Sequence, residues 1–199
     1  MKTSLKTLLA AVMTAVVLSS TVLTSMATVK SGALRTLPAK HEIKKVIVRG
    51  NTKVFLVQSN TEYVEMEESN VDKVSVKQVG NELLISSSEK SPVVVTVYVK
   101  DIFRVDASND AVIKTVGKLN VKFLQVILKD HAIAKIKTNT ESLYTVINDH
   151  ASLELLGATN KLILKTDGFA KLNTEKFAAV ITSNVPADNN AIAMNTNAQ

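Results

Sequence analysis

Several residue types are scarce in this chain of 199 residues, and each shortage excludes a class of structure or chemistry. There is no cysteine and no tryptophan, and there are three prolines and six glycines. Without cysteine the chain has no disulfide, no thiol nucleophile, no thiolate metal ligand and no lipid-modified cysteine anchor. Packing and backbone hydrogen bonds must therefore hold the fold together.

Aromatic residues make up 4% of the chain, and its formal net charge at pH 7 is +6. The lysines stand singly along strand-like segments, and we interpret them as solvent-facing strand positions that protect sheet edges. A nucleic-acid-binding surface would need a concentrated basic patch with stacking aromatic side chains, and the sequence shows neither. We therefore expect no nucleic-acid partner.

Catalytic motifs are missing as well. There is no G-x-S-x-G nucleophile elbow and no S-x-x-K motif followed by its partner motifs. The pair at 117–118 (GK) lacks the glycine-rich loop of a phosphate site. Asp106, Asp110 and Glu154 have no context that marks a glycosidase pair, so we interpret them as solvated carboxylates. The sequence predicts no catalytic residue, no cofactor and no enzyme activity.

The first 27 residues have the three parts of a signal peptide. Lys2 and Lys6 form the positive start, residues 8–18 (LLAAVMTAVVL) the apolar core, and residues 25–27 (SMA) a cleavage site. The alternative is an uncleaved membrane anchor, but hydroxyl residues interrupt the apolar run before it reaches the ~20 residues of a span. Cleavage would remove two lysines and no acidic residue, which lowers the charge from +6 to +4.

No later segment is apolar enough to cross a membrane, so we expect no integral span after cleavage. The location expected for the mature chain is the periplasm, the outer membrane surface or the outside of the cell. Residues 28–42 carry little apolar pattern and hold Gly32 and Pro38, and we interpret them as a flexible lead-in.

Strand patterns begin at Ile43. Runs rich in Val, Ile and Thr alternate with turn signals about every ten residues, and helical periodicity is absent. The expected strands are residues 43–48, 53–58, 63–66, 74–79, 83–86 and 93–99, with turns at 50–52 (GNT) and 80–81 (GN). We predict an all-β chain with a single domain over residues 43–185 and a polar C-terminal tail over residues 186–199.

One short pattern recurs in the second half of the chain. It stands at residues 109–111 (NDA), 130–132 (DHA), 149–151 (DHA) and 168–170 (GFA), so its alanines are 21, 19 and 19 residues apart. A period of this length is typical of stacked structural units that bury each other's apolar faces. We predict two short strands and two turns in each unit, with every strand paired in parallel to the next unit.

The corners of these units have a geometric explanation. Their first positions are Asn109, Asp130, Asp149 and Gly168, the residue types that most readily accept a positive φ or form side-chain turns. The alanine that ends each corner suits a tight interior site.

Two histidines, His131 and His150, occupy the same corner position in successive units, and stacking predicts that they lie ~5 Å apart. One hypothesis is a metal site with these histidines as ligands and Asp130 or Asp149 in support. Two histidines leave a four-coordinate site incomplete, and the glycine–aspartate nonapeptide of calcium-binding β-rolls is missing. We favour a solvated turn and predict no bound metal.

The phenylalanines fall into two groups. Phe55, Phe103, Phe123 and Phe177 lie in apolar runs, and we expect them in the core. Phe169 stands at a corner, where it is either an exposed contact residue or a residue covered by the C-terminal tail; we favour the second alternative.

Three segments carry a resemblance to a known family. Residues 46–58 (VIVRGNTKVFLVQ), 74–86 (VSVKQVGNELLIS) and 95–107 (VTVYVKDIFRVDA) are similar to the opening segments of the auto-transporter adhesin head GIN domain family. The resemblance spans residues 43–183. This chain has Asn, Asp and one Gly at the corners where family members carry glycine-rich sequences, and these residue types solve the same turn problem.

The resemblance implies a right-handed parallel β-helix-like solenoid with rungs of ~20 residues, exported to the cell envelope. It brings no catalytic or binding residues. Our hypothesis is a non-enzymatic adhesion or interaction module that binds an envelope glycan or protein through outward residues such as Lys122, Lys135, Lys137 and Glu154. The alternatives are a polysaccharide lyase or hydrolase and a periplasmic lipid carrier with an open β-groove.

Overall fold

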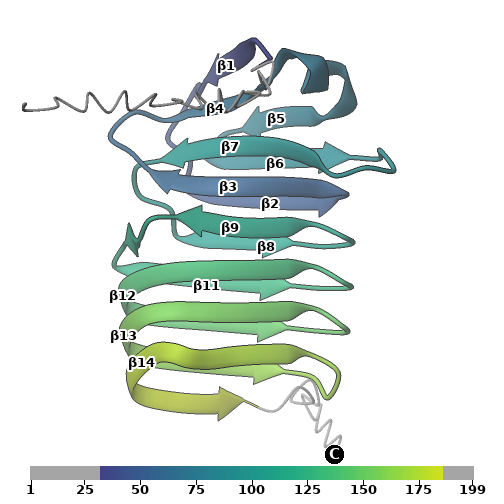
Figure 1. Ribbon diagram of the computed structural model, residues 1–199. Helices are drawn as coiled ribbons and strands as arrows, with labels where there is room; N and C mark the ends of the chain where they lie inside the picture. The colour runs from purple at the N-terminus through teal and green to yellow at the C-terminus, as the bar shows by residue number, and fades with distance from the viewer. Residues whose placement is uncertain (1–31, 186–199) are drawn as a thin grey trace, which may run out of the picture. The chain divides into compact units, whose positions relative to one another are not determined.

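The computed structural model describes residues 32–185, and these residues form one curled, mixed β-sheet (Figure 1). The only helix among them is the 3₁₀ helix η1 (Glu68–Lys73). The strands are β1 (Leu34–Pro38), β2 (Lys45–Gly50), β3 (Thr52–Gln58), β4 (Tyr63–Glu67), β5 (Ser75–Val79), β6 (Glu82–Ser87), β7 (Val93–Val99), β8 (Arg104–Ala107), β9 (Val112–Val116), β10 (Leu119–Asn120), β11 (Phe123–Leu128), β12 (Ile133–Ile147), β13 (Ser152–Thr166) and β14 (Lys171–Val185). The prediction of an all-β chain is confirmed.

The sheet has two walls that face each other across the core. Along the hydrogen-bonded path, the front wall runs β1-β4-β7-β3-β9 to β12, and the back wall continues from β12 through β11-β8-β2-β6 to β5. The strands β12, β13 and β14 cross from the front wall to the back wall, so each contributes to both (Figure 1). The two walls are therefore continuous at one end of the molecule.

Most strand pairs are parallel. Successive repeat units pair with an offset of 19 residues, as in Ile133 with Ser152 and Ser152 with Lys171. Antiparallel pairs occur only at the N-terminal end of the described chain, where β1 pairs with β4, β4 with β7 and β5 with β6. The predicted parallel pairing between repeat units is present in these pairs.

The second turn expected in each repeat unit is replaced by a curve within one strand. β12, β13 and β14 are each 15 residues long and continuous around the bend. The ladder between β12 and β13 continues through this bend, because Asn139 pairs with Ala158 and Thr140 with Thr159. The sequence signal for two strands was correct in its faces, but the backbone bonds do not break between them.

The core consists of aliphatic side chains. The completely buried residues are Val, Ile, Leu and Ala, and they include the corner alanines Ala111, Ala132 and Ala151. Polar side chains in the core are hydrogen bonded: the Thr138 hydroxyl donates to the Leu119 carbonyl at 2.8 Å. Within residues 32–185 no buried side-chain nitrogen or oxygen lacks a partner.

The expectation that four phenylalanines belong to the core is wrong. Phe103 and Phe123 are 45% and 56% exposed, and Phe55 and Phe177 are only partly buried. Strand alternation explains Phe123, because its neighbour Leu124 points inward and is 1% exposed. The space between the walls holds one aliphatic side chain from each strand position, so the larger rings lie outside.

Part of the segment expected to be a flexible lead-in forms a strand. Residues 34–38 are β1, which pairs antiparallel with β4 at the edge of the front wall. The segment has no strand alternation that the sequence could reveal, because its exposed positions carry both leucine and polar residues. The signal peptide expected at residues 1–27 and the tail expected at residues 186–199 lie outside the described residues.

The last strand is less apolar inside than those before it. One inward column runs Leu124, Leu143 and Leu162 on β11, β12 and β13, and on β14 the same position is Thr182. Next to it, Leu164 pairs with Asn184. This switch suits a strand that ends the stack, because the inner face of β14 has no further strand of the described chain to cover it.

Candidate functional surfaces

The corners between the back and front walls form a ladder of side-chain to backbone hydrogen bonds. Asn109, Asp130 and Asp149 all have φ near +60°. The Asp130 carboxylate accepts from the Asn109 amide at 2.8 Å, and the Asp149 carboxylate accepts from the Asp130 amide at 3.0 Å. The ladder extends to Gly50, whose amide donates to the Asn109 side-chain oxygen at 3.3 Å. Each polar corner residue thus stabilises the corner next to it.

The fourth corner was assigned to the wrong residue. Gly168 was expected to occupy the same position as Asp149, but it has no positive φ, and Asp167 continues the ladder by accepting from the Asp149 amide. The Asp167 carboxylate also accepts from the amides of Phe169 and Ala170 at 3.1 and 3.2 Å. This last corner is a turn closed by its own aspartate, so it needs no left-handed residue.

The ladder predicts an asymmetry between two substitutions at Asp149. Asp149→Ala removes the acceptor of the Asp130 amide and places alanine in the left-handed region, so we expect unfolding to become easier by about 1 to 2 kcal/mol. Asp149→Asn keeps an acceptor oxygen and tolerates this conformation, so its loss should be less than half as large. Urea unfolding measures both; equal losses would contradict the ladder.

Acid should weaken the ladder at its last corner. The bond from the Asp149 amide, followed by those from Phe169 and Ala170, lowers the pKa of Asp167 below its ordinary value. A lowered folded pKa means that this stabilisation is present above the unfolded pKa of about 3.9 and is lost as pH falls through the folded pKa. We expect Asp167→Asn to flatten the stability curve below about pH 4, measured by urea unfolding, while leaving its slope at higher pH unchanged.

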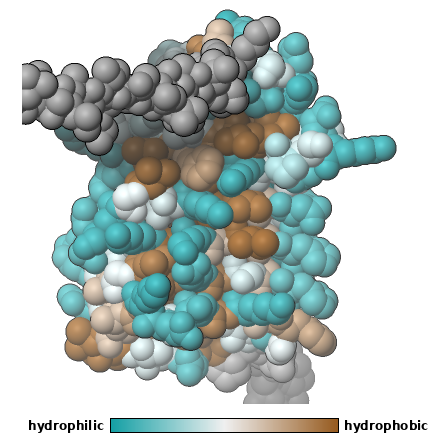
Figure 2. Space-filling model, in the orientation of Figure 1, coloured by the Kyte–Doolittle hydropathy of each residue, from teal (hydrophilic) through white to brown (hydrophobic). Residues whose placement is uncertain are grey.

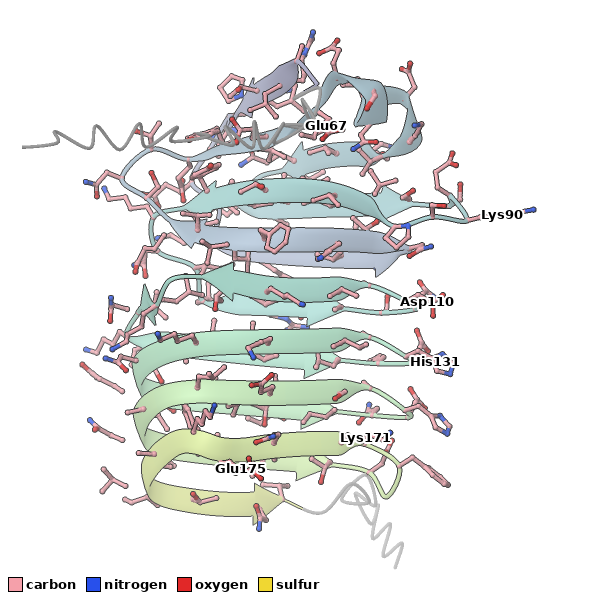
Figure 3. All side chains as sticks on the ribbon, in the orientation of Figure 1. Glu67, Lys90, Asp110, His131, Lys171 and Glu175 are labelled. Atoms are coloured by element: carbon pink, nitrogen blue, oxygen red, sulfur yellow. The ribbon has the colours of Figure 1, made fainter. Side chains whose placement is uncertain are left out.

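The side chains that follow the ladder residues form an exposed column. The rings of His131 and His150 stack with centroids 5.6 Å apart and an interplanar angle of 17°, close to the predicted separation. Phe169 continues the stack, 5.4 Å from His150, and is 70% exposed. Figure 3 shows Asp110 and His131 projecting from successive corners along this edge. The candidates Asp130 and Asp149 lie beside the histidines, but their carboxylates bind backbone amides.

The outer face of the front wall collects lysines. Between β3 and β14 its outward lysines are Lys53, Lys114, Lys135, Lys137, Lys171 and Lys176, which pair with other outward positions of the wall. The carboxylates are Glu154, beside Lys135 at 2.8 Å, and Glu175 on the bulged part of β14. We call this surface the basic face. Figure 2 shows hydrophilic side chains with hydrophobic ones between them over the front wall, and Figure 3 labels Lys171 and Glu175.

This gathering was missed in the sequence because its members are far apart along the chain. Lys114 and Lys135 are 21 positions apart, and they stand directly opposite each other because β9 and β12 pair in parallel. Lys53 lies two strands of the wall away from Lys135, through β9. The repeat period was a usable signal, since folding the sequence at that period aligns two of these lysines.

Of the residues proposed to make contacts, Lys122 lies away from the basic face. It stands just before β11, near Glu141 at 3.8 Å, and its ammonium is 5.5 Å from the ring centroid of Phe123. Lys135, Lys137 and Glu154 lie together on the front wall. The proposed contact residues therefore belong to two different surfaces.

The back wall has a compact group of ion pairs instead of a single-sign surface. Arg104 donates two hydrogen bonds to Asp106, at 2.7 and 3.0 Å, and these raise the pKa of the guanidinium. Lys45 lies 3.0 Å from Glu82 and 3.8 Å from Asp106. The charges in this group are matched, so they do not favour a ligand of either sign.

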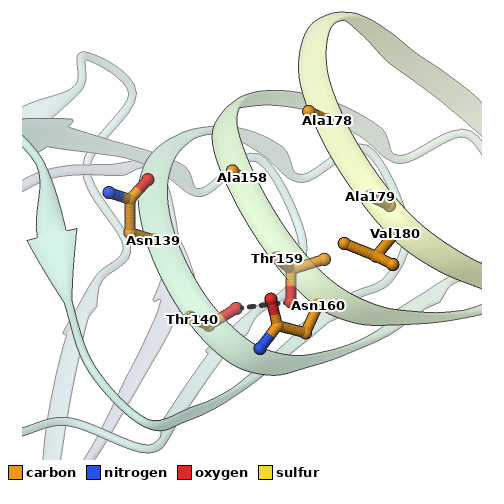
Figure 4. A pocket seen from close by; sticks show the side chains of 8 residues that line it. All are labelled: Asn139, Thr140, Ala158, Thr159, Asn160, Ala178, Ala179 and Val180. Carbon is orange, nitrogen blue, oxygen red and sulfur yellow. Dashed lines mark hydrogen bonds between the residues drawn. The ribbon is translucent and has the colours of Figure 1, made fainter.

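Two hollows lie at opposite ends of the sheet. One, of about 370 Å³, is an open depression at the bend of the last three strands, where Thr140 donates to Thr159 at 2.9 Å (Figure 4). The other, also of about 370 Å³, lies at the N-terminal end and has an apolar lining with two polar side chains. Its lining residues are Leu37, Pro38, Ala39, Lys40, Ile43, Val64, Val76, Gln78 and Leu83.

Within residues 32–185 no three His, Asp or Glu side chains gather as a metal site would require. A helix long and apolar enough to cross a membrane is also absent from these residues.

Comparison with known proteins places the chain among bacterial surface proteins. Residues 42–198 match the family described as "putative auto-transporter adhesin, head GIN domain". A crystal structure of a putative adhesin from Bacteroides fragilis is similar, with a TM-score of 0.62, 14% identity and coverage of 77% of this chain and 78% of that one. No curated protein matches the sequence.

Two structures from Parabacteroides distasonis have the same fold. One, a putative adhesin, has a TM-score of 0.57 and 13% identity over 78% of this chain and 79% of that one. The other is named a putative lipid binding protein, with a TM-score of 0.56 and 10% identity over 78% and 79% of the two chains. At these identities the likeness concerns the fold alone.

Proposed function

Because this chain belongs to the auto-transporter adhesin head GIN domain family, we propose that it is a non-enzymatic, exported protein of the cell envelope that binds a partner through an outer face of its sheet. Export is supported by the three-part pattern of residues 1–27. The compartments that fit are the periplasm, the outer membrane surface and the cell exterior.

One observation carries this proposal. The interior of the described chain is filled by aliphatic side chains, and its polar chemistry lies on two broad outer faces and one exposed corner. A rigid sheet of this kind presents side chains at fixed spacings to a large partner. An envelope glycan or an envelope protein is therefore a better match than a small substrate.

The chemistry of the carboxylates supports a protein without enzyme activity. Asp130, Asp149 and Asp167 are stacked closely enough to suggest a glycosidase pair, but each accepts a hydrogen bond from the next corner's backbone. Asp167 has a lowered pKa, whereas a general acid needs a raised one. Turnover of any polysaccharide in a uronic-acid panel, lost on Asp→Asn substitution, would overturn this part of the proposal.

Retention on cells tests the binding function. We expect fluorescently labelled chain to be retained by whole cells and by at least one purified envelope glycan or protein fraction, and to be displaced by excess unlabelled chain. The heat-unfolded chain serves as the control for nonspecific adsorption. Uniform absence of saturable retention would contradict an adhesion role, and fractionation of the producing cells identifies the compartment.

A second candidate function, lipid carriage, has one specific observation in its favour. The hollow at the N-terminal end is lined mainly by apolar side chains, with Ile43 and Leu83 buried beside it, and its volume is in the range of ligand pockets. One fold relative is named a putative lipid binding protein. Native mass spectrometry of the purified chain decides: co-purifying lipid that is lost on Val64→Trp would replace adhesion as the leading function.

We further propose that the histidine corner binds no metal. Rings that stack face to face point their nitrogens side by side, and a single tetrahedral ion needs them to converge. Titration calorimetry with zinc and with calcium is expected to give no heat of binding at micromolar metal. Binding that disappears on His131→Ala and on His150→Ala would reverse this.

The finer architecture is also a proposal: the curled sheet is a right-handed β-solenoid. Support comes from the constant parallel offset between units and from the strong preference of parallel strand crossovers for the right hand. An experimental structure of the chain would test the hand directly.

A further inference from the structure

We infer that the basic face of the front wall binds a linear anionic polysaccharide, through lysine contacts to its carboxylate or phosphate groups. The inference rests on the proposed envelope-binding function and names the surface and the partner chemistry. Its basis is the arrangement of six lysines on one side of a continuous sheet.

The lysines point outward because they alternate with core residues. Lys114 follows Ile113, which is completely buried, and Lys135 and Lys137 flank the completely buried Ile136. Lys135 and Lys137 are exposed, and Lys53 and Lys114 are half-buried. The parity of the strand therefore fixes the ammonium groups on the solvent side of the front wall.

The charge of this face is uncompensated. Lys135 has a carboxylate partner, Glu154, at 2.8 Å. Within residues 32–185 no carboxylate lies within ion-pair distance of the other five lysines of the face. Farther up the same wall, β4 presents Glu65 and Glu67, so the positive charge is confined to the part of the wall from β3 to β14. An anionic partner would be attracted to this part alone.

Stability does not explain the pairing of like charges. Lys114 and Lys135 are directly opposite each other on neighbouring strands, and like charges at such positions destabilise a sheet. The back wall shows the opposite solution, since Lys45 stands opposite Glu82 and close to Asp106. A ligand that neutralises Lys114, Lys135 and Lys137 together would remove this repulsion.

The spacing of the face suits a polymer. Neighbouring strands are about 4.8 Å apart and alternate residues along a strand about 6.6 Å apart, so the ammonium groups form a grid instead of a single anion site. No enclosed hollow among those found in the described chain is lined by these lysines. A polymer with regularly spaced charges can contact several lysines at once and release its counterions on binding.

The aromatic content of the face favours a polysaccharide over a nucleic acid. Single-stranded nucleic acids are held by bases stacked on aromatic rings. The aromatic residue on the basic face is Phe55, and the Lys53 ammonium lies over its ring, 5.1 Å from the centroid. A stacking platform for successive bases is therefore not available, whereas lysines alone can bind a carboxylated or phosphorylated glycan.

The test compares two triple variants of the full chain with the same change in charge. Lys114→Gln, Lys135→Gln and Lys137→Gln alter the basic face, and Lys77→Gln, Lys161→Gln and Lys165→Gln alter the back wall. Binding to polygalacturonate, polyphosphate, neutral dextran and single-stranded DNA is measured by affinity electrophoresis at low and high salt. Melting curves check that both variants fold, and the single exposed variant Lys137→Glu replaces the first triple if it does not fold.

We expect wild-type chain to bind polygalacturonate or polyphosphate, which distinguishes carboxylate from phosphate recognition, and to release it at high salt. The basic-face variant should bind at least about tenfold more weakly, and the back-wall variant within about twofold of wild type. Equal losses in both variants, preference for DNA, or no binding to either polyanion would overturn the inference. If the basic-face variant keeps full retention on whole cells, the envelope-binding function stands and the basic face is excluded as its surface.

Discussion

Gly157→Ala is expected to destabilise the chain by at least about 3 kcal/mol, the largest effect of any single methyl group we foresee. Gly157 lies in the bend of β13 with φ +104°, a conformation that side chains other than hydrogen rarely adopt. A Cβ at this position would stand 2.1 Å from the carbonyl oxygen of Thr138 on the neighbouring strand. That oxygen belongs to backbone within the ladder, so it cannot move away without breaking the β12–β13 pairing.

The matched control is Gly168→Ala. Gly168 has no positive φ, and no heavy atom lies within 4 Å of its added Cβ, so this variant should unfold within about 0.5 kcal/mol of wild type. Chemical unfolding followed by far-ultraviolet circular dichroism measures both, and the yield of soluble protein gives a second measure for Gly157→Ala. Similar stabilities of the two variants would show that the bend is not as tight as described.

Leu143→Ala should cost about 3 to 4 kcal/mol, because it opens a cavity in the middle of the stack. Leu143 is completely buried on β12, between Leu124 on β11 and Leu162 on β13 in the same inward column. Aliphatic neighbours on both sides are fixed by the backbone ladders and cannot close the space. Thermal and urea unfolding of the variant should both show the loss.

Thr182→Ala tests the same column at its last strand. Thr182 pairs with Leu162 but is exposed, so its truncation should change stability by less than about 1 kcal/mol. A loss close to that of Leu143→Ala would mean that β14 is covered on its inner face in solution. The comparison therefore measures how far burial extends toward the C-terminal end of the described chain.

The sequence predicted the β-structure well where local chemistry decides it. Alternation located the strands that begin at Tyr63 and Val93 to within one residue. Gly50, Asn109 and Asp130 were expected at sharp corners and all have a positive φ. These features depend on the preference of single residues for a backbone region, which a sequence shows directly.

Features that depend on contacts between distant residues were not predictable in the same way. Gly157 was not singled out, because its requirement comes from the Thr138 carbonyl of the neighbouring strand. Phe123 was assigned to the core from its apolar neighbours, and only the register of β11 shows that Leu124 takes the inward place. The basic face likewise exists only after parallel pairing brings Lys114 opposite Lys135.

The two Asp-His-Ala corners have a consequence for how such chains change length during evolution. Asp130 and Asp149 are 19 residues apart, have the same φ to within a degree and occupy equivalent places in the ladder. An in-frame duplication of the segment between them would join one corner to its own copy, with the hydrogen bonds, the buried alanine and the strand register already correct. The stack can therefore be lengthened by one unit through a single genetic event, without first passing through a misfolded intermediate sequence.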